Sequence, residues 1–442
     1  MPEGFSGADT AFMLVCAALV MLMTPGLAFF YGGMVRVKSV LNMLMMSFVS
    51  LGIVSVLWVL YGFGIAFGED RGGVVGFSGK YLGLSGIGLN ELWDGYGIPV
   101  TVFAAFQLMF AVLTPALISG ALADRVKFSA WTLFVALWVT VVYFPVAHWV
   151  WGAGGWLFEM GVIDFAGGTA VHINAGAAAL GAVLVLGRRI GFKKDPMRPH
   201  NLPLVMLGAG LLWFGWFGFN AGSWLGADGV TAMAFVNTHV ATAAALLGWL
   251  AYERIRHGSF TTLGAASGAV SGLVAITPAC GAVSPLGAIA VGVVAGVACA
   301  AAVGLKYKFG YDDSLDVIGV HLVGGLIGSV LVGLLATGGV QSDVKGLLYG
   351  GGAGQLGKQV VGALAVLAYS FAASWILAKA VDLVMGFRVS EEDEVTGVDR
   401  TAHAETAYDY SGTGGGRTAT APAGHTAGTI SGATARDTKV DA

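Results

Sequence analysis

The stretch Asp164-Phe-Ala-Gly-Gly-Thr-Ala-Val-His172-Ile-Asn174 places a carboxylate and an imidazole in a chain that is otherwise strongly apolar. Ionisable side chains at membrane depth cost about 2.5–3.5 kcal/mol each on insertion scales, so they usually face a cavity, pair with one another or handle a substrate. A second stretch, Asp313-Ser-Leu-Asp316-Val-Ile-Gly-Val-His321, again has an acidic residue eight positions before a histidine that follows a valine. Two matching segments predict a shared functional site rather than two isolated packing residues.

The composition around these segments is that of a membrane protein. Of 442 residues, 56% are hydrophobic, 11% are charged and 70 are glycine, with a mean hydropathy of +0.77. Apolar runs of about 20 residues can cross a hydrocarbon core of about 30 Å as helices. They recur along the chain and predict an all-α polytopic fold with eleven transmembrane helices. The predicted spans are 10–34, 41–67, 99–121, 128–151, 166–187, 202–222, 231–251, 261–277, 285–305, 315–337 and 356–386.

Basic residues predict the orientation, because cytoplasmic loops carry an excess of Lys and Arg. Four basic residues fall in one set of alternate loops, and they are Arg71, Lys80, Lys345 and Lys358. The other set has thirteen, which are Arg36, Lys38, Arg125, Lys127, Arg188, Arg189, Lys193, Lys194, Arg198, Arg254, Arg256, Lys306 and Lys308. We therefore expect an extracellular N-terminus and a cytoplasmic C-terminus.

The two histidine segments suggest an inverted 5+5 repeat followed by a C-terminal helix, because an odd number of helices per half reverses its topology. His172 then enters from the outer face and His321 from the inner face, each about 12 Å along its helix from its acidic partner. We expect both rings to be neutral, with one donating an N–H to the other. Paired imidazoles also occur in metal sites, but no third ligand is visible at that depth, so we predict no metal and no cofactor.

Asp164 has a structural interpretation of its own. A carboxylate at a helix N-terminus accepts backbone N–H groups and complements the helix dipole. We give capping more weight than direct contact with an ion. We also expect Asp164→Asn to keep the hydrogen bonds and to remove only the charge.

Aromatic side chains gather at the outer ends of three predicted helices. Phe106 and Phe110 lie four residues apart on one helix face, Trp151 ends the next helix, and Phe219 stands one turn before Ser223. Each residue alone is at least as consistent with an interfacial belt or core packing as with a binding role. Together with Asp164 they are suited to a small cation, which aromatic faces and a nearby carboxylate attract.

Five motifs follow one another along the chain, and they are Pro25-Gly-Leu-Ala-Phe-Phe-Tyr-Gly-Gly-Met-Val-Arg36, Ala123-Asp-Arg-Val-Lys127, the Asp164–Asn174 stretch, Gly215-Trp-Phe-Gly-Phe-Asn-Ala-Gly-Ser223 and Phe235-Val-Asn-Thr238. In this order they resemble the ammonium transporter (Amt/Mep/Rh) family over residues 10–410. The resemblance implies an eleven-helix fold and a homotrimer with one pore per subunit. It assigns Phe106, Trp151 and Ser223 to ammonium recruitment with Asp164 beneath, Phe110 and Phe219 to a phenyl gate, His172 and His321 to a twin-histidine pore, and Trp216 to a position near the pore.

The expected function is transport of ammonium, with methylammonium as an analogue, across the cell membrane. Deprotonation would separate ammonium from potassium, and ammonia would pass the histidines with separate proton transfer. The alternatives are an electroneutral ammonia channel and an ammonium sensor. An intramembrane enzyme is disfavoured, because neither a metal-ligand set nor an activated nucleophile is visible. We expect no nucleic acid partner.

The chain beyond the last span changes in composition. We predict a transmembrane domain over 1–388, a cytoplasmic regulatory tail over 389–410 that docks on the inner face, and a disordered tail over 411–442 rich in Gly, Thr and Ala. The family resemblance also implies that a P-II-type signal protein binds the cytoplasmic face.

Overall fold

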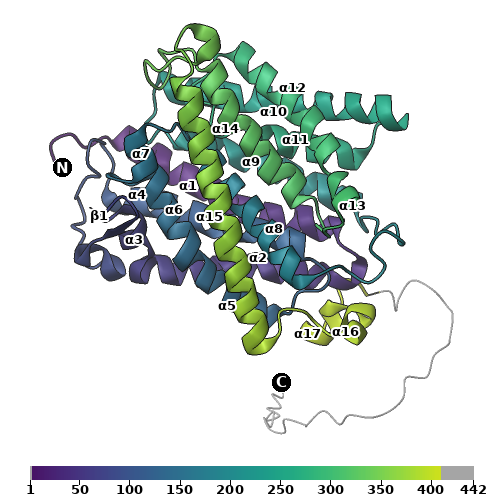
Figure 1. Cartoon of the computed structure of the whole chain (residues 1–442). Coiled ribbons are helices and arrows are strands. Elements are labelled where there is room, and N and C mark those ends of the chain that lie inside the picture. Colours follow the sequence, from purple (N-terminus) through teal and green to yellow (C-terminus); the bar gives the residue numbers. More distant parts are fainter. Residues whose placement is uncertain (1, 410–442) are drawn as a thin grey trace, which may run out of the picture. The chain divides into compact units, whose positions relative to one another are not determined.

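A computed structural model describes residues 2–409, so the predicted disordered tail over 411–442 lies outside the described residues. The described chain is almost entirely helical (Figure 1). Within residues 2–409, ten helical spans are long and apolar enough to cross a membrane. They are Gly7–Met34, Val37–Phe67, Val100–Leu122, Phe128–Met160, Gly168–Leu186, Leu202–Gly222, Gly229–His257, Pro285–Phe309, Ile318–Leu335 and Gly354–Met385.

These spans are built from α-helices with shorter turns between them. The α-helices within the spans are α1 (Gly7–Met34), α2 (Val40–Leu57), α3 (Phe63–Phe67), α4 (Val100–Leu122), α5 (Phe128–Trp138), α6 (Phe144–Trp151), α7 (Trp156–Met160), α8 (Asn174–Leu186), α9 (Leu202–Gly222), α10 (Gly229–His257), α12 (Pro285–Ala302), α13 (Leu305–Phe309), α14 (Val323–Leu335) and α15 (Gly354–Met385). Short 3₁₀ turns lie at η1 (Val37–Ser39), η3 (Gly79–Leu84) and η7 (Leu347–Tyr349).

The predicted eighth span, 261–277, corresponds to α11 (Thr262–Ile276), which is apolar but has only 15 residues. At 1.5 Å per residue it extends over about 22 Å, less than the hydrocarbon thickness. The side chain of Thr261 caps its start, and a buried run of turns from Thr277 ends it. The structure thus confirms a polytopic helical fold, whereas the count of eleven crossings and the full inverted repeat stay predictions.

Both predicted histidine segments begin with a π-helical turn, η5 (Gly168–Ile173) before α8 and η6 (Ile318–Leu322) before α14. Two further π turns, η2 (Trp58–Gly62) and η4 (Val139–Tyr143), interrupt other spans. Single π turns inside α-helices are frequent at functional sites. The η5 and η6 segments thus share a backbone conformation as well as the spacing of an acidic residue eight positions before a histidine.

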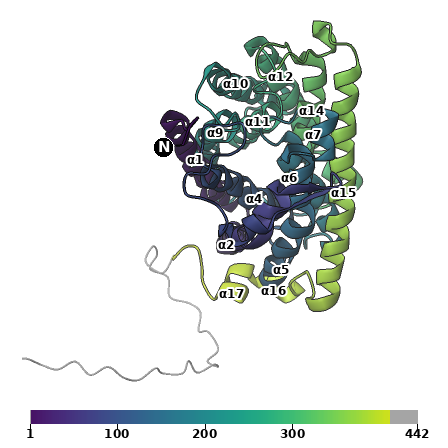
Figure 2. The ribbon, with the colours of Figure 1, turned by 90° about the vertical axis from the view of Figure 1, so that its left-hand side faces the viewer.

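Close helix packing surrounds these segments. α1 and α9 lie against each other along much of their length, and α15 packs on α8, α14 and α5 (Figure 2). A Cβ added at Gly208 of α9 would lie 2.2 Å from the backbone nitrogen of Phe30 in α1. Small residues at such contacts let membrane helices approach closely. Gly208 is therefore needed for the contact between α1 and α9.

One end of the bundle carries a short antiparallel hairpin of β1 (Glu69–Arg71) and β2 (Val75–Phe77) beside α3 (Figure 1). We call this end the outer face, after the predicted orientation. The ring of His148 in α6 contacts Ala66 O at 3.0 Å and Asp70 Oδ1 at 3.0 Å. The hydrogen bond from His148 lowers the pKa of the Asp70 carboxyl, which remains ionised on this face.

The opposite end carries α13 and two tail helices, α16 (Glu391–Thr396) and α17 (Val398–His403). Asp399 in α17 accepts hydrogen bonds from the backbone N–H groups of Leu41 and Asn42 at 3.0 and 2.8 Å. Glu394 is buried and pairs with Arg388 at 2.6 Å. Residues 391–403 thus pack against the start of α2 and the loops beside it.

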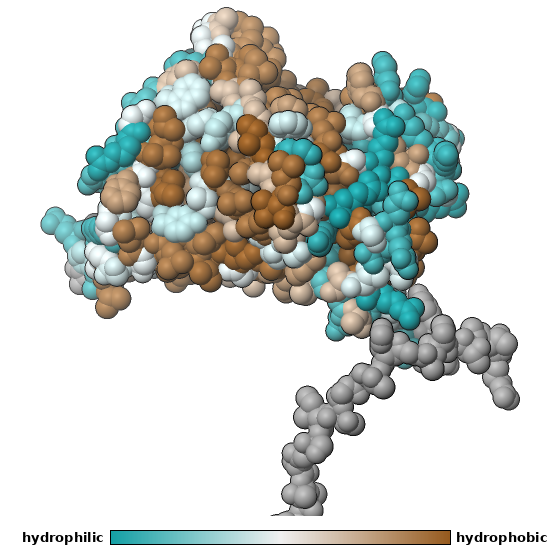
Figure 3. Space-filling model, turned by 60° about the horizontal axis from the view of Figure 1, so that its bottom comes forward, coloured by the Kyte–Doolittle hydropathy of each residue, from teal (hydrophilic) through white to brown (hydrophobic). Residues whose placement is uncertain are grey.

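Exposed side chains on the spans are mostly apolar, and Figure 3 shows hydrophobic residues over much of one face with hydrophilic residues gathered toward one end. Leu14 on α1, Leu247 on α10 and Leu364 on α15 are each more than half exposed, at 53%, 65% and 55%. Large apolar areas of this kind mark a membrane or protein contact. This surface fits a protein embedded in lipid.

Candidate functional site

Asp164 caps the helix that carries His172. Its Oδ1 accepts the N–H groups of Gly167 and Gly168 at 3.0 and 2.6 Å, and its Oδ2 accepts those of Thr169 and Ala170 at 2.9 Å each. The carboxylate is 6% exposed. Four N–H groups at a helix start have no partner within the helix, and this one side chain satisfies them. The predicted cap is present and fixes where η5 begins.

The same loop fixes Trp151 at the end of α6. The indole Nε1 donates to the backbone oxygen of Asp164 at 2.9 Å. Gly167 has φ of +116°, a conformation that residues with a side chain rarely adopt, and a Cβ there would lie 2.6 Å from Val171. Trp151 and the start of η5 therefore form one structural unit.

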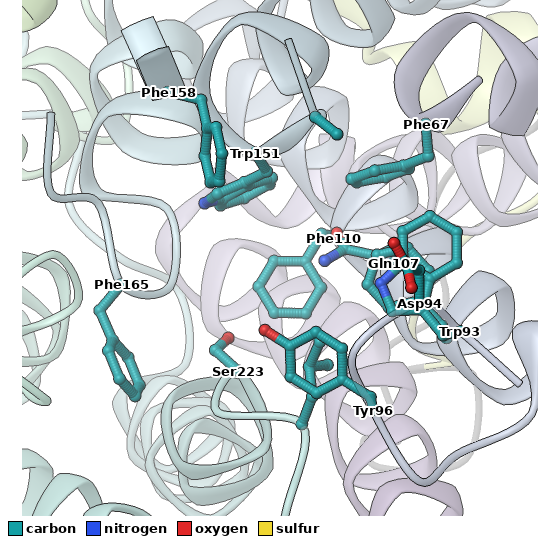
Figure 4. Close-up of a pocket in the computed structure, with 13 residues that line it drawn as sticks. Phe67, Trp93, Asp94, Tyr96, Gln107, Phe110, Trp151, Phe158, Phe165 and Ser223 are labelled. Atoms are coloured by element: carbon teal, nitrogen blue, oxygen red, sulfur yellow. The ribbon is translucent and has the colours of Figure 1, made fainter. Parts of the chain in front are cut away.

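A cavity of about 290 Å³ opens at the outer face above this unit (Figure 4). Three of the predicted site residues, Phe110, Trp151 and Ser223, line it. The Ser223 hydroxyl donates to Phe219 O at 2.8 Å, which leaves its lone pairs free to accept from a cation. The complete lining consists of Phe67, Trp93, Asp94, Tyr96, Phe103, Gln107, Phe110, Trp151, Ala153, Phe158, Phe165, Ser223 and Leu225.

Phe106, which was expected at the recruitment site with Trp151 and Ser223, does not line this cavity. It is fully buried, and its ring meets that of Phe110 edge to face with centroids 4.9 Å apart. A Cβ on Gly222 would lie 2.9 Å from it. Phe106 therefore supports Phe110 from behind in this conformation.

Phe110, which lines the cavity, stacks on a second phenyl ring, that of Phe219, which does not line it. Phe110 of α4 and Phe219 of α9 have centroids 4.2 Å apart and an interplanar angle of 26°. Trp151 meets Phe110 edge-on at 5.9 Å, and Phe219 lies 6.1 Å from the ring of His172. Trp151, the phenyl pair and the histidine thus follow one another inward from the cavity.

His172 and His321 meet beneath the phenyl pair. Their Nδ1 atoms are 3.2 Å apart. Both residues are buried, with exposed fractions of 0% for His172 and 2% for His321. One Nδ1 must donate and the other accept, so the hydrogen bond requires at least one ring to be neutral. The Nε2 atom of His172 has no hydrogen-bond partner among residues 2–409. Trp216 stacks on His172 at 5.3 Å and anchors itself through Nε1 to Thr277 Oγ1 at 2.8 Å.

The segment before His321 is built like the one before His172. Asp313 accepts the N–H groups of Val317 and Ile318 at 3.0 and 2.7 Å. Burial raises the pKa of Asp313 to about 6, although the nearby Lys306 lowers it. Lys306 itself pairs with Asp316 at 2.6 Å. Each histidine therefore follows a helix start that is fixed by a buried carboxylate.

Several lining residues were not expected from the sequence. Phe103, Gln107 and Phe110 share one face of α4 at spacings of four and three residues, a signal that the sequence contained. Phe67 ends α3, whereas Trp93 and Asp94 lie in the irregular loop before α4, where no periodicity indicates which way the chain folds. Their contribution to the cavity emerges only from the structure.

Comparisons of the whole chain with known proteins identify its family. A model of the Ammonium Transporter Family matches residues 11–408. An ammonium transporter of Mycobacterium bovis is 59% identical over 432 residues, which cover 91% of each chain. An ammonium transporter of Bacillus subtilis is 48% identical over 403 residues, covering 90% of this chain and 98% of that protein.

Solved structures give the same result. The crystal structure of Saccharomyces cerevisiae Mep2 aligns with a TM-score of 0.82 at 34% identity, covering 88% of this chain and 91% of that one. A structure named Sensor Amt Protein aligns with a TM-score of 0.81 at 30% identity, covering 89% and 98%. The chain therefore belongs to the ammonium transporter family, as a multi-pass membrane protein.

Proposed function

We propose that the protein recruits ammonium in the outer cavity, removes a proton from it, and conducts ammonia past His172 and His321 into the cytoplasm, with the proton transferred separately. The observation that carries this proposal is the buried histidine pair, whose Nδ1 atoms lie 3.2 Å apart behind the stacked rings of Phe110 and Phe219.

Recruitment rests on the aromatic walls of the cavity. Trp151 and Phe110 present π faces and edges at its floor, and a cation over such faces gains about 2 kcal/mol or more when desolvated. Ser223 adds a hydroxyl oxygen that can accept an N–H from the ion. Asp164 supports the site from below through its cap and its bond to Trp151, without lining the cavity.

Beyond the phenyl pair, a full charge is disfavoured. The cost of moving an ion into a dry interior is several kcal/mol even after relaxation, whereas neutral ammonia carries no such cost. Potassium cannot lose a proton and is excluded by the same barrier. The unpartnered Nε2 of His172 provides a hydrogen-bonding position for ammonia, and Trp216 fixes the ring that presents it.

The test uses purified protein in vesicles, with the internal pH and the transmembrane current recorded after an ammonium pulse. The proposal predicts an ammonium-evoked current that is absent after a potassium pulse and lost in His172→Ala. A rapid rise in internal pH without current would instead establish an electroneutral ammonia channel. The absence of both signals would contradict transport and favour the sensor alternative, which the name of one structural relative also raises.

The family resemblance extends the proposal to partners. We propose a homotrimer with one pore per subunit, methylammonium as a transported analogue, and a P-II-type signal protein on the cytoplasmic face, where the tail over 389–410 would take part in regulation. Light scattering of the detergent-solubilised protein, with bound detergent subtracted, would give three times the mass of the 45.3 kDa chain. A monomer mass would contradict the trimer.

A further inference from the structure

We propose that Asp94 is a second recruiting carboxylate of the outer cavity and that its charge sets the apparent affinity for the transported cation. The inference rests on the proposed function and adds a residue to it. Asp94 is the one charged side chain among the residues that line this cavity. Figure 4 shows it beside Trp93 and Gln107, across the cavity from Phe165.

Backbone hydrogen bonds hold the loop that carries Asp94. Tyr96 N donates to Trp93 O at 3.0 Å, and Trp93 N donates to Ile98 O at 2.8 Å. Gly95 has φ of +77°, as the third residue of a type II turn requires. Asp94 is thus the second residue of a closed four-residue turn.

The loop is also anchored to the wall of the cavity. The Trp93 ring stacks on Phe103 of α4 with centroids 4.0 Å apart and an interplanar angle of 12°. On its other side, Ser6 N donates to Gly97 O at 2.8 Å. A residue next to a stacked tryptophan keeps its position relative to α4, so the carboxylate stays at the cavity.

Other carboxylates nearby are already engaged. Asp164 satisfies four backbone N–H groups, Asp70 binds His148, and Glu91 pairs with Lys80. Within residues 2–409, Asp94 has neither an ion-pair partner nor a hydrogen bond to its side chain, and it is exposed. An uncompensated negative charge beside aromatic walls raises the local concentration of cations.

The size of the effect follows from Coulomb's law. Two opposite unit charges about 7 Å apart in water attract with an energy of about RT. An attraction of this size raises the occupancy of the cavity by the cation about threefold. Screening shortens the range to about 10 Å at 0.1 M salt and about 3 Å at 1 M. The contribution of Asp94 should therefore appear in KM, at low ionic strength, and fade at high salt.

The experiment measures ammonium-evoked initial currents of wild type, Asp94→Asn and Asp94→Glu in vesicles of uncharged phosphatidylcholine, so that the lipid adds no surface potential. Asp343→Asn is the matched control, because Asp343 is an exposed carboxylate in a predicted outer loop and does not line the cavity. We expect Asp94→Asn to raise KM about threefold at 10 mM salt with an unchanged maximal current. The difference should vanish at 1 M salt, and Asp94→Glu should retain the wild-type KM.

Three results would overturn the inference while leaving the transport function intact. They are an unchanged KM in Asp94→Asn, a change no larger than that in Asp343→Asn, and a loss of maximal current without a change in KM. The last would mean that the side chain only supports the loop. Absence of current in the wild type would contradict the proposed function itself and the inference with it.

Discussion

At the scale of single residues, the two oxygens of Asp164 divide four backbone N–H groups between them, two for each oxygen. Asparagine offers one acceptor oxygen and one donor amide, so it can serve only two of the four groups. The expectation that Asp164→Asn would keep the hydrogen bonds is therefore wrong. The substitution removes the negative charge and, at the same time, the acceptor for two of the four N–H groups.

We predict that Asp164→Asn destabilises the protein by about 2 kcal/mol or more, because buried N–H groups without partners cost about 1–3 kcal/mol each. Asp164→Ala, which leaves four N–H groups without this acceptor, should cost more. Thermal unfolding in detergent measures both, with Asp343→Asn as the control. Equal midpoints for Asp164→Asn and wild type would mean that a water or a shifted backbone replaces the lost acceptor.

At the scale of elements, the tail helix α17 provides the N-terminal cap of α2. Asp399 accepts from Leu41 and Asn42, and the ring of His403 meets Asn42 Oδ1 at 3.0 Å. We predict that Asp399→Ala weakens docking of the tail by about 1 kcal/mol, the usual cost of a lost cap. Limited trypsin digestion at the exposed Arg400 should then be faster by several-fold.

Glu391→Ala is the control for this digestion, because Glu391 is exposed on α16 and its side chain makes no hydrogen bond within residues 2–409. Equal cleavage rates in Asp399→Ala, Glu391→Ala and wild type would show that other contacts, such as the buried Glu394, hold the tail in place.

Asp312, in the segment after α13, is buried with Arg189, which follows α8, and Arg125, which lies between α4 and α5. It therefore joins three segments that are distant in the sequence. Arg189 Nη2 contacts Asp312 Oδ1 at 2.8 Å, and Arg189 N donates to Oδ2 at 2.7 Å. Burial alone would raise the pKa of Asp312, but the hydrogen bond from Arg189 and the charge of Arg125 outweigh it and lower the pKa. A carboxyl with a lowered folded-state pKa stabilises the protein above its unfolded value of about 3.9 and loses that contribution as the pH falls through the folded-state value.

We therefore predict that Asp312→Asn costs about 3–5 kcal/mol at pH 7, because it leaves buried arginine charge less compensated. The difference from wild type should shrink as the pH is lowered below about 4. Thermal unfolding midpoints of the two proteins between pH 3 and pH 7, again with Asp343→Asn alongside, measure this. A difference that stays constant with pH would show that hydrogen bonding, rather than charge, accounts for the effect.

At the scale of the whole molecule, local signals predicted much of the described chain. Hydrophobic runs predicted the spans, because a segment in lipid must form all its backbone hydrogen bonds within itself and therefore becomes a helix. The equal spacing of Asp164 before His172 and Asp313 before His321 predicted that the two histidines meet, and they do. The orientation of Phe106 was not predictable, because helical spacing places it beside Phe110 without saying which ring faces the cavity. The loop with Trp93 and Asp94 was missed because its position depends on stacking against Phe103, a contact between distant parts of the sequence.

We propose that the molecule excludes potassium because only a species that gives up its charge can pass from the cavity to the histidines. In the proposed mechanism, the phenyl stack and the buried Nδ1 pair form that barrier together. A fixed negative charge at the histidine position would offset part of the desolvation cost of a cation. It should therefore admit potassium.

The most direct test compares potassium-evoked and ammonium-evoked currents in wild type and in His172→Asp, with purified protein in the same vesicles. The account predicts an ammonium current and no potassium current in the wild type, and a potassium current in His172→Asp. A variant that still carries ammonium and still excludes potassium would contradict the claim that the histidine pair is the selectivity filter.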